Sequence, residues 1–504
     1  MTSPHDLPAP GPGAPTPPIA LRDGAAAAAA HLAAPPVEVP PGVLEALGAV
    51  CSTSVDPAVV GEASRDWWPQ AMVWALAGEV PARAGAVVSP TTADQVARVL
   101  AVCHEARVPV TAAAGRSGVC GASVPLHGGV VLDLCGLRGI IEVDAASLVL
   151  DVAPGTFGDH LEHQLRTEHG LTLGHWPQSV ALSTVGGWLA CRSAGQLSTR
   201  YGKIEDMVLG LDVALADGRQ ISTGGAPRAA VGPDLNQLFV GSEGTLGIIT
   251  GARLRLHRAP RHERRAAYGF ASFADGLDAM RRLRQRGATP AVLRLYDPTE
   301  SDRTYHTGDR ALLLVLDEGE PAIVDMTMEL VAEECRDASH EDVEHVAHWL
   351  EHRNDVAALE ALISRGYVVD TMEVAGRWRD LPALYAATTH ALREVEGTIA
   401  ASAHQSHTYP DGGCVYFTFA GKVDADQRDR YYRAVWDAGT AAALGAGGAL
   451  SHHHGVGLNR SRFVAEALGP AHDVLVATKA ALDPHGILNP GKLGLPSGFG
   501  PAPY

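Results

Sequence analysis

The chain has 504 residues with 46% hydrophobic content, enough for roughly two to four domains with large buried cores. Its formal net charge of −17 argues against nucleic acid or an anionic membrane as the main partner, because both repel an acidic body. Seven cysteines without a CxxC pair indicate a reducing compartment, and no apolar run is long enough to span a bilayer, so the sequence predicts a cytoplasmic protein without a transmembrane segment.

The first part of the chain is predicted to be a tail followed by a nucleotide-binding domain. Residues 1–38 are rich in proline and alanine and are expected to be disordered, because that composition cannot offset the entropy of ordering, and residues 39–83 are expected to be a helical segment. The pattern then alternates strand, helix and strand, with a capping box that begins at Thr92. A hairpin with Asp217 in its turn completes an α+β domain over residues 84–258.

Two glycine-rich loops of this domain are candidates for a phosphate-binding site. The loop at residues 112–125 follows an apolar run and combines glycine, serine and arginine. A second segment contains Ser183, Thr184, Gly186 and Gly187, whose small side chains and free backbone N–H groups let the main chain approach a large planar ligand and its phosphates. One such loop is a weak signal, but two in one domain suit a dinucleotide.

The rest of the chain is predicted to form a second α+β domain over residues 259–480. A proline-bearing basic stretch at residues 258–265 is expected to link the two domains. Extended segments at residues 291–297 and 311–318 then alternate with helical patterns, and the chain is rich in helix signals from residue 428 onward.

Four motifs carry a family resemblance. The stretch GHWPQSVALSTVGGWLACRSAGQLSTRYGKIEDMVLGLDVALADGR and the later GSEGTLGIIT resemble the PCMH-type or vanillyl-alcohol-oxidase FAD-binding domain. Near the C-terminus, GGCVYFTFAG and LSHHHGVG match the pattern of the alkyldihydroxyacetonephosphate synthase (alkylglycerone-phosphate synthase) family, and the likeness covers about residues 84–493. It implies an α+β fold: a PCMH-type FAD-binding domain, then a ferredoxin-like α+β substrate or cap domain with a helical C-terminal segment, of which residues 481–504 return to the FAD domain.

The same resemblance implies FAD as the cofactor. Cys120 overlays the position at which some flavoproteins of the superfamily attach FAD through a histidine, so a cysteinyl–flavin bond is one hypothesis, and a small residue packed beneath the ligand is the alternative. The residues implied to contact FAD lie in the two loops and the closing segment: Ala114, Gly115, Arg116, Ser117, Gly118, Val119, Cys120, Ser123, Pro177, Gln178, Ser183, Thr184, Gly186, Gly187, Ser193, Glu243, Thr245, Gly247 and Ile248.

The catalytic candidates also follow from the resemblance. In that family FAD holds an acyl-dihydroxyacetonephosphate while the fatty acid leaves and a fatty alcohol replaces it. Arg294 aligns with an arginine near the flavin and suits oxyanion or phosphate recognition; the alternative is a strand arginine that faces solvent. Tyr416 aligns with a tyrosine that abstracts a proton, which requires a lowered pKa, or orients the substrate; its strand position also suits core packing. His452, His453 and His454 are implied as donors and acid–base groups.

No metal is predicted. Related flavin dehydrogenases of D-2-hydroxy acids have a carboxylate ligand where His453 stands, and the upstream block here has His407 and Asp411 but lacks the second histidine. Five histidines, including His404 and His407, could still gather a zinc ion, but a carboxylate partner is missing.

The substrate stays open. The synthase family has a further phosphate-binding arginine where Leu359 or Glu360 stands here, with Arg353 and Arg365 offset. The leading interpretation is synthase-like exchange on a small-molecule or lipid substrate. The alternatives are an FAD-dependent oxidase or dehydrogenase of a D-2-hydroxy acid or alcohol, and a flavoprotein that only binds or transfers electrons. A homodimer is one option for assembly.

Overall fold

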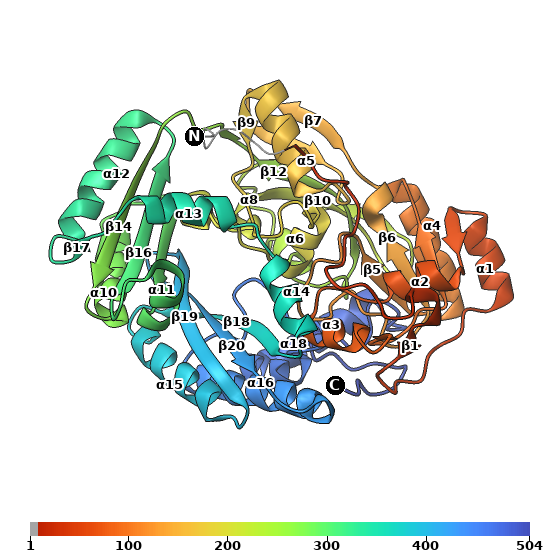
Figure 1. The fold of residues 1–504 in the computed structure, drawn as a ribbon. Coiled ribbons are helices and arrows are strands. Elements are labelled where there is room, and N and C mark those ends of the chain that lie inside the picture. Colours follow the sequence, from red (N-terminus) through yellow and green to blue (C-terminus); the bar gives the residue numbers. More distant parts are fainter. Residues whose placement is uncertain (1–8) are drawn as a thin grey trace.

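Two domains lie side by side in the computed structural model, which describes residues 9–504 (Figure 1). The first domain contains the orange and yellow elements, and the second contains the green and blue ones. The N-terminal segment packs along the first domain; its elements are β1 (Ala29–Ala30), α1 (Pro41–Gly48), β2 (Ser52–Ser54), α2 (Pro57–Ala63), α3 (Pro69–Ala75) and β3 (Glu79–Val80).

The first domain is built on two sheets. One has the order β2-β4-β6-β5, in which β4, β6 and β5 are parallel, and the other is antiparallel with the order β11-β10-β12-β8-β7. The elements are β4 (Ala86–Ser89), α4 (Ala93–Ala106), β5 (Val110–Ala113), β6 (Val130–Asp133), β7 (Ile140–Asp144), β8 (Val149–Val152), α5 (Gly158–Gln164), β9 (Leu171–Thr172), α6 (Val185–Cys191), α7 (Ser198–Tyr201), α8 (Ile204–Met207), β10 (Val208–Ala214), β11 (Gln220–Ser222), α9 (Asn236–Phe239), β12 (Ile248–Arg255) and β13 (His257–Arg258).

The second domain is built on one antiparallel sheet with the order β17-β14-β16-β15-β19-β20-β18. Helices α10, α12, α15 and α16 pack against this sheet. The elements are β14 (Glu263–Phe270), α10 (Phe273–Gln285), β15 (Val292–Tyr296), α11 (Pro298–Tyr305), β16 (Ala311–Glu318), α12 (Pro321–Glu334), β17 (Ser339–His340), α13 (Glu344–His352), α14 (Ala357–Ser364), β18 (Val368–Arg377), α15 (Leu381–Glu394), β19 (Thr398–Thr408), β20 (Gly412–Gly421), α16 (Arg428–Gly445), α17 (Val464–Leu468) and α18 (Ala471–Leu482).

Strand β20 shows why the two faces of this sheet differ. Its side chains alternate between the faces, as they do in any strand. Val415 and Phe417 are fully buried in the core shared with the helices, whereas Tyr416 lies on the opposite face, which is turned toward the first domain. Glu373 of β18 and His404 of β19 pair directly with Tyr416 and therefore share that face. The sheet thus presents a polar row to the first domain.

Two sequence expectations differ from the structure. The expectation of a disordered tail does not hold for residues 9–38, because Ile19 and Leu21 are buried in a cluster with Trp67 and Met72. Residues 1–8 lie outside the described part of the chain. The expected linker at 258–265 is shorter, because β13 ends at residue 258 and β14 begins at residue 263.

The C-terminal segment lies against the first domain. The backbone N–H of Val110 donates to the carbonyl of Ile487, and the N–H of Asn489 donates back to the carbonyl of Val110, both at 2.8 Å. This bridge extends the parallel sheet at β5. Among residues 9–504, no helix combines the length and the apolar character needed to cross a bilayer.

Candidate active site

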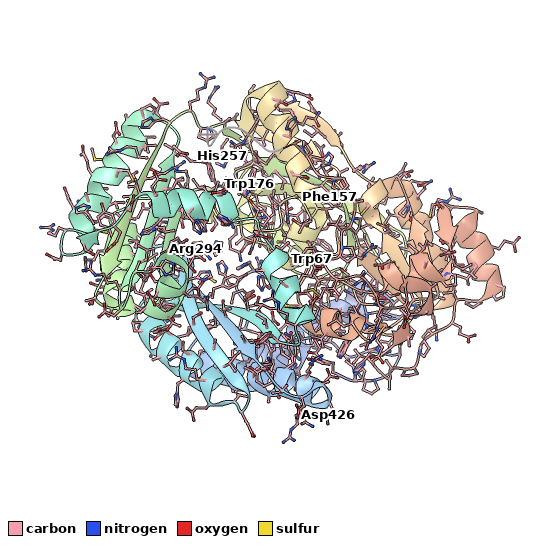
Figure 2. All side chains as sticks on the ribbon, in the orientation of Figure 1. Trp67, Phe157, Trp176, His257, Arg294 and Asp426 are labelled. Atoms are coloured by element: carbon pink, nitrogen blue, oxygen red, sulfur yellow. The ribbon has the colours of Figure 1, made fainter. Side chains whose placement is uncertain are left out.

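A cavity of about 470 Å³ lies between the two domains. Its volume is in the range of small-molecule sites. In Figure 2, Trp67, which lines the cavity, and Trp176 lie on the first-domain side of the boundary, and Arg294 lies on the second-domain side. The second domain contributes Thr371, Tyr416, His453 and His454, together with Asp355, Val356, Ala358 and Leu359 at the start of α14.

The two glycine-rich loops form the first-domain wall of this cavity. Every residue expected to contact FAD lines it except Thr245, whose buried hydroxyl donates to the carbonyl of Ser242. At Gly187 an added Cβ would meet nothing closer than Thr184 Oγ1 at 3.5 Å, so the backbone there opens onto free space. The small residues therefore leave room for a cofactor against the main chain, which fits FAD.

Cys120 lines the cavity but is poorly suited to a covalent bond. Burial raises the pKa of its thiol well above 9.0, so the reactive thiolate is scarce. We therefore expect acid precipitation of the yellow protein to give a colourless pellet and a yellow supernatant, measured by visible absorbance of both fractions. A pellet that stays yellow after washing would establish the covalent bond instead.

The polar row of the sheet brings the catalytic candidates together. The hydroxyl of Tyr416 is hydrogen bonded to Nε2 of His454, and its ring stacks on His404 with centroids 4.9 Å apart. His404 is hydrogen bonded through Nδ1 to Glu300 at 3.0 Å. Burial, with a further contribution from the charge of Glu373, raises the pKa of Tyr416 well above 10.0. Tyr416 is therefore a neutral phenol, and the lowered pKa expected of a tyrosinate base is not found.

The histidine block is held by a buried carboxylate that sequence reasoning missed. Glu373 accepts hydrogen bonds from the backbone N–H groups of all three histidines, and its carboxylate binds the buried guanidinium of Arg460 at 2.9 Å. These contacts hold the backbone of the loop in place. Glu373 lies between the apolar Met372 and Val374 of β18, and a charge at such a position is its sequence signal, because an unpaired buried charge is costly.

The first domain holds the same loop from the other side. Glu243, expected at the cofactor, accepts hydrogen bonds from the backbone N–H groups of Val456 and Gly457. Lys203 donates to the carbonyl of His452 at 2.6 Å. The loop is thus fixed by buried charges of both domains, and its position depends on how the domains meet.

His454 is the candidate proton acceptor next to Tyr416. Its Nε2 receives the Tyr416 hydroxyl, and its Nδ1 lies 3.8 Å from Glu373. Burial lowers the pKa of His454 from 6.5 to about 4, and the charge of Glu373 only partly opposes this. Below that pKa the imidazole is protonated and cannot accept.

This shift predicts the pH dependence of turnover. Because His454 stays neutral as pH falls through 6.5, we expect kcat to remain level between about pH 6 and pH 8 and to decline only as pH approaches about 4. The measurement is kcat against pH, with visible absorbance to show that FAD stays bound. An inflection near the ordinary histidine value would contradict this assignment.

Two catalytic candidates do not line the cavity. Arg294 lies on β15, where its Nε donates to Tyr296 at 2.7 Å and its guanidinium lies over that ring. Among residues 9–504 its terminal nitrogens have no hydrogen-bond acceptor. Its charge opposes the rise in the pKa of Tyr416, so the two groups are close. His452 does not line the cavity either, and both of its ring nitrogens are hydrogen bonded, Nε2 to Tyr409 and Nδ1 to His453.

Neither arginine expected near the phosphate position reaches the cavity. The guanidinium of Arg353 lies 5.1 Å from the ring centroid of Trp176 and 5.6 Å from that of Trp349, and Arg365 is exposed beyond α14. Leu359 lines the cavity instead. This part of the wall combines the apolar Val356, Ala358 and Leu359 with Asp355, and none of these four residues is a cation.

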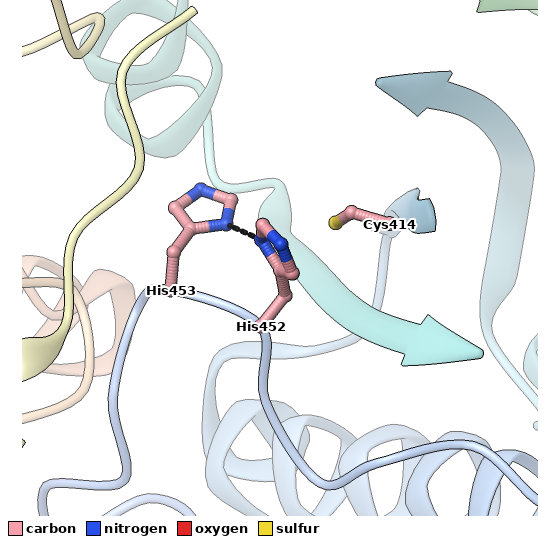
Figure 3. A group of neighbouring side chains, drawn as sticks. All are labelled: Cys414, His452 and His453. Atoms are coloured by element: carbon pink, nitrogen blue, oxygen red, sulfur yellow. Dashed lines mark hydrogen bonds between the residues drawn. The ribbon is translucent and has the colours of Figure 1, made fainter. Parts of the chain in front are cut away.

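One cluster has the donor types of a metal site. Ligand atoms of Cys414, His452 and His453 lie within 4.8 Å of one another (Figure 3). Two of these side chains are hydrogen bonded to each other, since Nδ1 of His452 and Nδ1 of His453 are 2.9 Å apart. Burial also raises the pKa of the Cys414 thiol well above 9.0, so it is a protonated thiol. The side chains are therefore arranged as a hydrogen-bonded pair beside a thiol.

The fold and the site define a two-domain flavoprotein of the PCMH or vanillyl-alcohol-oxidase type. Residues 84–224 match the FAD binding domain family, and residues 259–493 match the family described as FAD linked oxidases, C-terminal domain. The chain belongs to the FAD-linked oxidoreductases that combine these two domains, and FAD is its cofactor.

Three similar proteins illustrate the range of this group. The chain is 30% identical to the FAD-linked oxidoreductase YgcU of Escherichia coli K12, over 81% of this chain and 88% of that protein. It is 29% identical to the alkyldihydroxyacetonephosphate synthase of Dictyostelium discoideum, over 82% and 74%. A solved alkyldihydroxyacetonephosphate synthase structure has a TM-score of 0.76 at 24% identity, over 91% and 87%. The predicted superfamily, fold class and cofactor are confirmed, and the reaction stays a prediction.

Proposed function

We propose that the protein is an FAD-dependent oxidoreductase that oxidises a hydroxylated carbon of a small, singly anionic substrate. The observation that carries this proposal is the wall of the cavity: neither arginine expected near the phosphate position lines it, whereas Leu359 of α14 does. Arg294 does not line the cavity itself, but its charge acts on Tyr416, and within residues 9–504 its terminal nitrogens have no hydrogen-bond acceptor. One guanidinium suits one carboxylate.

The residues of the second domain supply the proton chemistry of this reaction. Bound FAD supplies the electron acceptor for the carbon that is oxidised. As the substrate hydroxyl loses its proton to the oxygen of Tyr416, the phenol proton passes to Nε2 of His454. The imidazolium formed lies beside Glu373, whose pKa is about 2 because the charges of Arg460 and His454 and the hydrogen bonds from both residues together outweigh the effect of burial, so it is an anion throughout.

A second candidate is the synthase-like exchange of an acyl group for a fatty alcohol. The LSHHHGVG and GGCVYFTFAG motifs favour it, since both stand at the cavity or behind it. It requires a phosphate contact, and neither Arg353 nor Arg365 lines the cavity.

The test is to mix FAD-loaded protein without oxygen with a panel of D- and L-2-hydroxy acids and alcohols, and to follow loss of the yellow colour. Rapid bleaching by one class supports the oxidoreductase. In parallel, palmitoyl-dihydroxyacetonephosphate and hexadecanol are incubated with the protein and analysed by mass spectrometry. Ether product without bleaching would replace the oxidoreductase proposal with the exchange reaction.

Arg294→Met tests the substrate charge. Methionine keeps the apolar part of the side chain but removes the donors, so we expect KM for an anionic substrate to rise about 10- to 100-fold, as for the loss of a charged hydrogen bond. The uncharged alcohol analogue should change by less than about twofold. Arg303→Met on the exposed side of α11 is the control. Equal losses for charged and uncharged substrates would show that Arg294 does not bind the anion.

A further inference from the structure

A chain of three rings leads from a turn of the second domain to the cavity. Tyr409 follows a bulge in β19, where His407 has a φ of 56° and the register with β20 shifts. The Tyr409 hydroxyl lies 2.8 Å from Nε2 of His452, and Nδ1 of His452 lies 2.9 Å from Nδ1 of His453. Figure 3 shows the last of these bonds. His453 lines the cavity.

The hydrogen bonds constrain where each proton sits. A neutral imidazole carries one N–H, so the bond between the two Nδ1 atoms takes the proton of one ring only. An imidazole nitrogen accepts more strongly than a phenol oxygen, and a phenol donates more strongly than a neutral imidazole. The favoured order is therefore Tyr409 donating to His452, and His452 donating to His453. The proton of His453 is then on Nε2.

We propose that Tyr409 is a positioning residue of the active site: through His452 it fixes His453 in the tautomer that presents Nε2–H to the cavity. A neutral N–H donor at that point stabilises negative charge that develops on a substrate oxygen, without carrying a charge itself. Burial lowers the pKa of both histidines well below 6.5, which keeps the pair neutral. The tautomer of His453 and its dependence on Tyr409 do not rest on the proposed function. Only the identity of the substrate oxygen whose negative charge is stabilised rests on it.

A metal bound at the Nδ1 atoms would be incompatible with the hydrogen bonds between Tyr409, His452 and His453. Coordination by His452 and His453 at their Nδ1 atoms would use the lone pair that accepts the hydrogen bond. Cys414, the third member of that cluster, takes no part in the chain of rings. The substitution Cys414→Ser therefore distinguishes hydrogen-bonded rings from a bound metal. It leaves the histidine tautomers unchanged if the rings are hydrogen bonded to each other, and it changes them if Cys414 helps to hold a metal.

The test is ¹⁵N NMR of the FAD-loaded protein labelled at its histidine rings, with His453→Gln to assign the His453 signals. We expect the Nε2–H tautomer for His453 in the wild type and in Cys414→Ser, and a mixture of both tautomers in Tyr409→Phe. Phenylalanine keeps the ring, and the yellow colour confirms folding. Three results would each overturn the proposal. They are an Nδ1–H tautomer of His453 in the wild type, an unchanged tautomer in Tyr409→Phe, and metal-shifted signals that Cys414→Ser abolishes.

A double-mutant cycle adds a kinetic test. Tyr409→Phe and His452→Gln are each expected to lower kcat about tenfold, with KM within about twofold of the wild type. The double variant should have a kcat no lower than that of either single variant, because both substitutions break the same series of hydrogen bonds. Tyr431→Phe, whose hydroxyl bonds to Thr398 at 2.9 Å, is the control. Additive losses would overturn the coupling. The NMR result does not depend on the substrate, so a wrong proposed function leaves it readable.

Discussion

Gly187→Leu is expected to give a folded protein with little or no bound FAD. Gly187 lies in α6 and lines the cavity, and an added Cβ would have only ordinary contact with Thr184 Oγ1. The substitution is therefore tolerated by the protein itself, while the larger side chain takes space that the cofactor needs. Overpacking of about 1–3 kcal/mol corresponds to roughly 10- to 100-fold weaker binding. The measurement is the ratio of visible to protein absorbance, followed by FAD titration of the apoprotein.

Two other glycines make the comparison specific. Gly48, in helix α1, also has an open Cβ position but lies on the surface, so Gly48→Leu should bind FAD normally. Gly115 is the opposite case, because its Cβ would lie 2.3 Å from the carbonyl oxygen of Leu182, and replacement should unfold the loop. Normal FAD affinity in Gly187→Leu would mean that the cofactor does not pass along α6.

The first-domain wall of the cavity could be predicted from the sequence because it is formed by short, continuous segments. The loops at residues 112–125 and around Gly187 depend on residues that are close along the chain, and almost all of them line the cavity. The alternation in β20 would also have placed Tyr416 on the face opposite Val415 and Phe417, because the period of a strand is two. Face assignment is thus available from sequence wherever one face is evidently apolar.

The support of the histidine loop was not readable from sequence because it is assembled from distant segments. Glu243, Glu373 and Lys203 reach the loop from three separate parts of the chain. Glu243 and Glu373 each lie between uncharged neighbours, and Lys203 lies in a mixed-charge stretch. Only the packing of two domains brings all three to the same backbone. Their burial is the physical sign of their role, since a buried charge persists only where it is paired or hydrogen bonded.

Tyr416→Phe is expected to retain FAD and to lower kcat about 10²- to 10⁴-fold, the usual range for loss of a proton-transfer group. The ring that stacks on His404 remains, so the change removes only the hydroxyl and its bond to His454. The raised pKa of Tyr416 adds a second expectation: turnover of the wild type should not increase in alkaline solution, because the phenol stays neutral. The measurements are kcat, KM and visible absorbance for both proteins.

Tyr431→Phe provides the matched control, because it also removes a buried hydroxyl, one bonded to Thr398 on the helix side of the sheet. It should leave kcat within about twofold. A Tyr416→Phe protein that keeps its colour and turns over within about threefold of the wild type would remove the hydroxyl from the mechanism. His454, still beside Glu373 and with its Nε2 then facing the cavity, would have to take the substrate proton directly.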